Sequence, residues 1–173
     1  MTAALQQVKT TLRELDLSVG LYSNFVEEVE CLKISPVKGQ LGPLQEFSCL
    51  RKLKAPIVTL LGWSPDELLR LAEVVPTGLT HLGLDLTEDL AQQCTYKLDE
   101  EFVLEELAVF LSVWKSVSVT PNLQVVEVWL TWIYGRWKDT EVVQLRKVCE
   151  EAGVLCIVHF NKMRGVFELG PLH

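Results

Sequence analysis

One spacing of apolar residues, L-x-x-L-x-L, recurs along the chain. The clearest copy is Leu79, Leu82 and Leu84, and related copies begin at Leu12, Leu50 and Leu123. Apolar residues at alternate positions are typical of a short strand with one buried face. We therefore predict strands at 12–17, 50–55, 79–84 and 123–130, and a fifth in the apolar run at 154–160. A weaker copy at 29–34 follows the first too closely to leave room for a return helix.

Helical patterns separate these strands. Ser64, Pro65 and Glu67 have the spacing of a helix N-cap, a first-turn proline and a capping box, which predicts a helix from 64 to Val75. The following Pro76 would end it. Amphipathic stripes predict longer helices at 99–116 and 140–152, and APIVTLLGW at 55–63 suits a short helix.

Strands that alternate with helices favour a parallel sheet. The strand copies start 38, 29 and 44 residues apart, whereas regular leucine-rich repeats run ~20–29 residues. We predict a single α/β domain over residues 1–173, an irregular leucine-rich-repeat-like solenoid. It would have a parallel sheet of about four to six short strands with helices on one face. The uncovered face would present polar side chains at alternate strand positions: Glu14, Asp16, Lys52, Lys54, His81, Asp85 and Glu127.

Composition excludes several classes of function. The net charge is −7 and the pI near 5.0, which argues against a nucleic-acid groove and against binding to anionic membranes. No apolar run reaches the ~18 residues of a membrane-spanning helix. The five cysteines are irregularly spaced and form no C-x-x-C, so we expect a cytoplasmic or nuclear protein without a disulfide framework. Gly-rich phosphate loops and known catalytic motifs are lacking, so we expect no cofactor.

Four segments show the repeated strand and helix pattern: SPDELLRLAEVVPTGLTHLGLDLTEDL, LKAPIVTLLGW, TPNLQVVEVWL and CEEAGVLCIVHF. Together they resemble the C-terminal repeat region of fungal F-box and leucine-rich-repeat-like proteins, from about residue 12 to 160. The resemblance implies a repeat region that binds a client protein, beside a separate F-box that docks onto a cullin ubiquitin ligase. Since the first predicted strand begins at Leu12, we expect no F-box in this chain.

Two groups of residues are candidates for chemistry or binding. His81, Asp85 and Glu127 on the uncovered face could form a site with the imidazole as a base, or could simply be solvated. Trp129, Trp132, Tyr134 and Trp137 lie within nine residues. They could form a binding hot spot or could cap the core. Cys149, Cys156 and His159 have a spacing unlike that of zinc ligands, so we assign them to core packing and predict no metal site.

The sequence thus leads to three hypotheses. The first is a non-enzymatic protein-binding module that uses the uncovered sheet face and the Trp-rich loop. The second is a small enzyme or small-molecule-binding protein with a site near His81, Asp85 and Glu127. The third is a fragment of an F-box ubiquitin-ligase substrate receptor.

Overall fold

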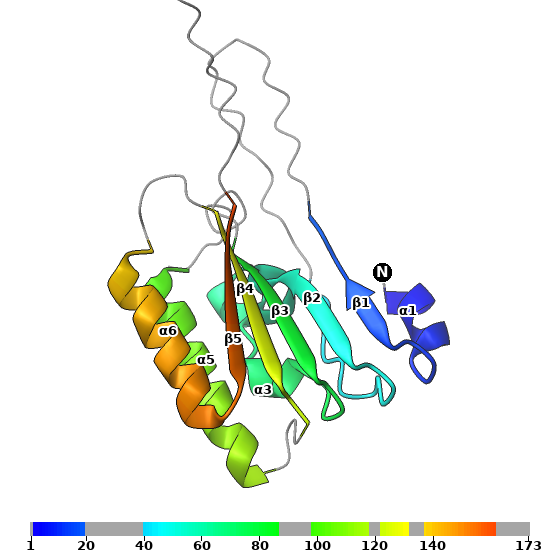
Figure 1. Cartoon of the computed structure of the whole chain (residues 1–173). Coiled ribbons are helices and arrows are strands. Elements are labelled where there is room, and N and C mark those ends of the chain that lie inside the picture. The colour runs from blue at the N-terminus through cyan, green and yellow to red at the C-terminus, as the bar shows by residue number, and fades with distance from the viewer. Residues whose placement is uncertain (1, 20–39, 87–97, 118–121, 132–136, 162–173) are drawn as a thin grey trace, which may run out of the picture.

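The computed structural model describes residues 2–19, 40–86, 98–117, 122–131 and 137–161. Five strands form one sheet in chain order, and every neighbouring pair is parallel (Figure 1). They are β1 (Glu14–Asp16), β2 (Lys52–Pro56), β3 (His81–Leu86), β4 (Val125–Thr131) and β5 (Leu155–Asn161). The predicted α/β class and parallel sheet are therefore confirmed.

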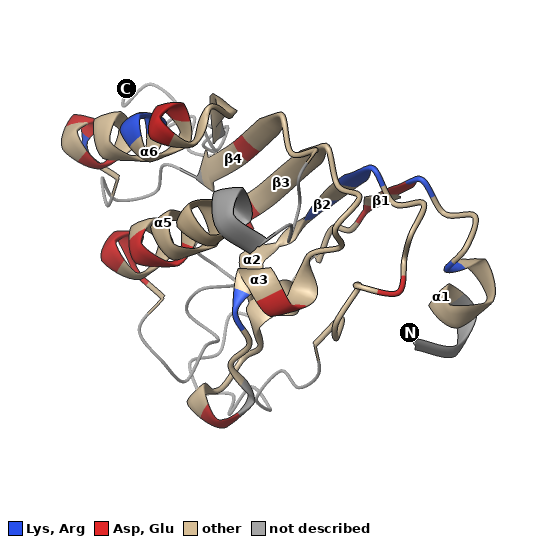
Figure 2. Cartoon of the chain, turned by 90° about the horizontal axis from the view of Figure 1, so that it is seen from below, with Lys and Arg blue, Asp and Glu red and all other residues tan. Residues whose placement is uncertain are grey.

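The described residues also form helices. They are α1 (Thr2–Val8), α2 (Ile57–Leu61), α3 (Leu71–Val74), α5 (Glu100–Val117) and α6 (Asp139–Ala152), with a 3-10 turn, η1, at Pro65–Glu67. Helices α2, α3, α5 and α6 lie on one side of the sheet, and α1 lies beyond the β1 edge (Figure 2). None of the described helices combines the length and apolar character that crossing a membrane would require.

The strand register follows the leucine spacing. Leu15 on β1 lies opposite Leu53 on β2, which in turn lies opposite Leu82 on β3. Val126 on β4 and Cys156 on β5 continue this row. Side chains alternate between the two faces of a strand. A second inward row therefore runs parallel to the first: Ala55, Leu84, Val128 and Val158. The members of both rows on β2, β3 and β4 are buried in the core.

The predicted helix at 64–75 is wrong. Residues 65–67 form only the 3-10 turn, Leu68 and Arg70 are extended, and the short helix α3 begins at Leu71. Ser64 makes no capping hydrogen bond from its side chain. The continuous helix is interrupted because backbone donors find tertiary partners instead.

Two hydrogen bonds account for the interruption. The Leu69 N–H donates to the carbonyl of Leu61 at 2.8 Å. The Leu71 N–H donates to the carboxylate of Glu106 on α5 at 2.7 Å. Local propensity is a weak determinant when such partners are available.

The other helical predictions are confirmed. The pattern at 99–116 corresponds to α5, and the pattern at 140–152 to α6. Gly153 ends α6 in the left-handed conformation, with φ +73°, as its place after the last apolar residue predicts. The short apolar run at 55–63 contains α2. The weak strand copy at 29–34 lies outside the described residues.

Candidate functional site

The sheet face opposite the helices holds a groove of about 440 Å³. Seven of the predicted binding residues line it: Glu14, Asp16, Lys52, Lys54, His81, Glu127 and Trp129. They come from β1 to β4 and share one face because the register aligns their positions in neighbouring strands. Figure 2 shows the resulting stripes of acidic residues on β1 and basic residues on β2.

Two ion pairs join the first two strands. Lys52 Nζ lies 3.0 Å from Glu14 Oε1, and Lys54 Nζ lies 3.8 Å from Asp16 Oδ2. The side chains of Glu14 and Asp16 are 66% and 68% exposed. Such solvated pairs contribute only about 0–1 kcal/mol each to stability. Their charges are therefore available to a partner at little cost to the fold.

Trp129 forms the wall of the groove on the β4 side. Its ring stacks on the imidazole of His159, with centroids 4.8 Å apart and planes at 13°. The ammonium of Lys54 lies 4.2 Å from a Trp129 ring centroid, a cation–π contact. Trp129 is thus held between side chains from β2 and β5.

Gly83 on β3 makes room for the indole. A Cβ atom at Gly83 would lie 2.7 Å from Cζ3 of Trp129, closer than real contacts allow. It would also lie 3.1 Å from Cβ and Cγ of Lys54. The glycine is therefore needed for the close approach of both neighbouring side chains.

The structure pairs Glu127 with His159. Glu127 Oε2 lies 3.5 Å from Nε2 of His159 on the adjacent strand. This distance is longer than a good hydrogen bond, and Nε2 has no hydrogen-bond partner among the described residues. A full ion pair forms here only when the imidazole is protonated.

His81 has a different partner. Thr80 Oγ1 donates to the carbonyl of Arg51 at 2.9 Å and lies 2.9 Å from His81 Nδ1. Which of the two atoms donates in the contact between Thr80 and His81 depends on the tautomer of the imidazole.

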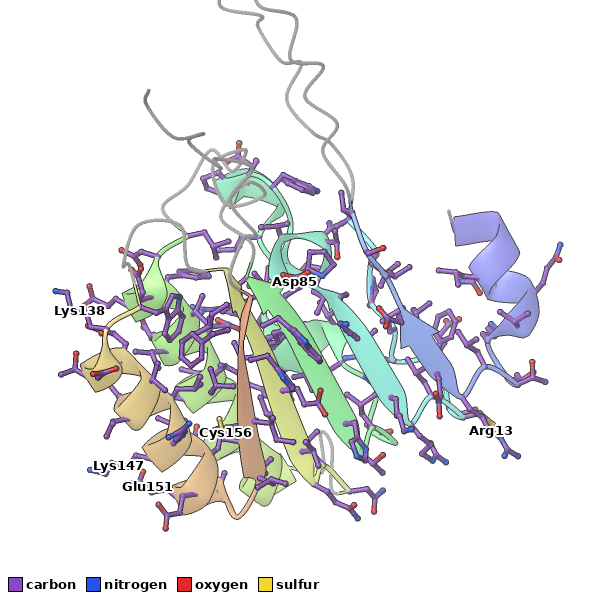
Figure 3. All side chains as sticks on the ribbon, turned by 45° about the horizontal axis from the view of Figure 1, so that its top comes forward. Arg13, Asp85, Lys138, Lys147, Glu151 and Cys156 are labelled. Carbon is purple, nitrogen blue, oxygen red and sulfur yellow. The ribbon has the colours of Figure 1, made fainter. Side chains whose placement is uncertain are left out.

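Asp85 is remote from His81. It lies four residues further along the same strand, which corresponds to about 13 Å. Figure 3 shows it near the C-terminal end of β3. The structure therefore does not place the Asp85 carboxylate where it could orient the His81 imidazole, although His81 and Glu127 line the same groove.

The predicted Trp-rich loop is only partly described. Trp132 and Tyr134 lie outside the described residues. Trp137 is half-buried, packs against the hydrophobic core just before α6, and does not line the groove. Trp129 is the predicted tryptophan that the structure places in the groove.

The cysteine and histidine group divides between the two faces. Cys149 is buried on α6 and Cys156 belongs to the inward row of β5, whereas His159 stacks on Trp129 on the other face. No cluster of potential metal ligands occurs among the described residues.

The assignment of His159 to core packing is wrong, because His159 lies on the open face of the sheet and stacks on Trp129. Aligning VLCIVHF with LQVVEVWL by strand parity puts His159 opposite Trp129, as the register shows. The sequence therefore predicts the position of His159 on the open face if the fifth strand is aligned with the other strands of the repeat series.

Comparisons with protein-family models, with curated proteins and with solved structures gave no match to this chain.

Proposed function

We propose that this chain is a non-enzymatic protein-binding module of leucine-rich-repeat-like solenoid form, with the groove on the open sheet face as its contact surface. The observation that carries the proposal is the groove itself. It is built from aligned positions of successive parallel strands and lined by exposed charged side chains around a fixed tryptophan. Fixed aromatic side chains with a charged rim are typical of protein contact surfaces.

The character of the groove favours a protein over a small molecule. Small-molecule sites are concave and bury most of the surface of their ligand. This groove is open to solvent, and its first two strands present exposed Glu14, Asp16 and Lys52. A partner that spans several strands can use these dispersed charges, whereas a small ligand cannot reach them together.

One observation favours a small ligand as a second candidate. The volume of about 440 Å³ falls within the size range of ligand pockets, and His81 lies in the lining. An imidazole in that position could act as a base. Loss of turnover in His81→Ala, on a substrate found by screening, would be needed to support catalysis.

The proposal also includes the protein family and the cellular location that the resemblance of the repeat segments implies. The chain would be related to the repeat region of fungal F-box and leucine-rich-repeat-like proteins, and would act in the cytoplasm or nucleus. The described cysteines, Cys49, Cys149 and Cys156, are free thiols, in keeping with a reducing compartment. A role as part of an F-box substrate receptor remains a proposal of the same kind.

Affinity purification with quantitative mass spectrometry tests the proposed surface. The chain is compared with Trp129→Ala and Asp16→Lys, which change the groove, and with Lys147→Ala and Glu150→Lys, which change exposed residues of α6. The proposal predicts partners whose enrichment is lost in both groove variants and retained in both α6 variants. Equal enrichment across all four variants would overturn it, provided that thermal melting shows each to be folded.

A further inference from the structure

Two thiols meet where α6 packs on β5. Cys149 lies on the sheet-facing side of α6 and is fully buried, and Cys156 is a half-buried member of the inward row on β5. Figure 3 shows Cys156 where β5 passes alongside α6. The turn at Gly153 brings the two elements together, and the Val154 N–H donates to the Cys149 carbonyl at 2.9 Å.

The two thiols share a hydrogen bond. This bond and burial raise the pKa of Cys149. The same bond lowers the pKa of Cys156 against the opposing effect of burial, and the charge of Arg146 acts in the same direction. Of the two thiols, Cys156 is therefore the one that loses its proton more readily. A thiolate is the reactive form of cysteine.

We propose that Cys149 and Cys156 form a site of reversible oxidation, an intramolecular disulfide that closes when the protein meets a peroxide. Both thiols face the interface between α6 and β5, and the turn at Gly153 joins these two elements directly. This inference does not depend on the proposed binding function, because both thiols lie on the helix side of the sheet.

The reaction balances in two steps. The Cys156 thiolate attacks one peroxide oxygen and the O–O bond breaks. This leaves a sulfenic acid at Cys156, and with hydrogen peroxide the other oxygen departs as water after protonation. The Cys149 sulfur then attacks the Cys156 sulfur, the S–O bond breaks, and hydroxide leaves as water with the Cys149 proton. The two thiols are oxidised to one disulfide, and the peroxide is reduced.

The difference in burial fixes the order of the steps. Cys149 has no exposed surface, so peroxide reaches the half-buried Cys156 first. Cys149 acts as the resolving thiol. A nearby resolving thiol intercepts the sulfenic acid before further oxidation.

Peptide mapping after treatment of the intact chain with hydrogen peroxide tests the proposal. Trypsin leaves Cys149 and Cys156 in one peptide, because no Lys or Arg lies between them. We expect this peptide to become lighter by two hydrogen atoms, to resist alkylation, and to recover its mass with dithiothreitol. Free thiols that persist, or over-oxidation of Cys156 without a disulfide, would overturn the proposal.

Two variants complete the test. Cys156→Ser should retain a free Cys149 after peroxide treatment, since the attacking sulfur is missing. Cys49→Ser removes a half-buried thiol elsewhere and should form the Cys149–Cys156 disulfide as the unaltered chain does. A disulfide that includes Cys49, or one between two chains, would contradict the assignment.

Discussion

Gly83 shows how one residue shapes the open face. Its missing side chain leaves the space that the Trp129 indole occupies, and the indole in turn separates Lys54 from His159. The need for glycine at this position is steric, because an added Cβ would collide with its neighbours. At Gly153 the need for glycine is conformational. An added Cβ would meet no neighbour, but the φ of +73° is one that other residues rarely adopt.

Gly83→Ala should therefore destabilise the protein through overpacking, by about 1–3 kcal/mol. Urea unfolding of the variant measures this cost. In a Trp129→Ala background the same change should cost much less, because its closest clash is gone. An equal cost in both backgrounds would show that the indole is not what requires Gly83.

At the scale of single elements, α3 depends on a side chain from α5. Glu106 is buried, and its carboxylate accepts from the Leu71 N–H at 2.7 Å and from Arg70 Nη1 at 2.6 Å. The hydrogen bond and charge of Glu106 raise the pKa of Arg70. A four-residue helix has little stability of its own. The buried carboxylate therefore fixes where α3 begins.

Glu106→Ala should destabilise the protein by roughly 2 kcal/mol, because the Leu71 N–H loses its partner inside the core. The Arg70 contact adds little, since that side chain is about half exposed. Chemical denaturation of Glu105→Ala, a change at the exposed neighbour on the same helix, is the control and should be nearly neutral. Similar losses in the two variants would contradict this role for Glu106.

The start of α6 is held by an exposed carboxylate. Glu141 Oε2 accepts from the Lys138 N–H at 2.8 Å and from Thr140 Oγ1 at 2.9 Å. Hydrogen bonds from the backbone and from Thr140 lower the pKa of Glu141 below its ordinary value of 4.5. A carboxyl with a lowered pKa in the folded state stabilises the fold above the unfolded pKa and loses that effect as pH falls.

We expect Glu141→Gln to be less stable than the unaltered chain at neutral pH. The difference should shrink as pH falls below 4.5, where the carboxylate of the unaltered chain becomes protonated. Thermal melting of both proteins across this range measures it. A difference that stays constant with pH would rule out the charged form as the stabilising one.

On the scale of the whole molecule, the sheet has one buried and one open face. Leu82 is fully buried toward the helices, whereas its neighbour His81 points to the groove. Leu82→Ala should cost about 2–5 kcal/mol, because it opens a cavity in the core. His81→Ala, on the same strand, should cost under about 1 kcal/mol. Equal losses in denaturant unfolding would show that both faces are packed.

Much of this architecture could be predicted from the pattern of apolar positions. The spacing around Leu53, Leu82 and Val126 gave the strands and the side on which they are buried, since alternation fixes the face of every residue. The broken helix after Ser64 could not be predicted in this way. One of its two causes is the carboxylate of Glu106, which lies far along the chain, and no local pattern around Ser64 contains it.

The sequence by itself determined that several polar residues face the open side of the sheet, including Glu14, Lys54 and Glu127. It did so because side-chain direction along a strand depends only on position. Only the tertiary structure decided which of them touch. It pairs Glu127 with His159, places Trp129 over Gly83 and separates His81 from Asp85, because contacts between strands depend on register and on the space that neighbouring side chains leave.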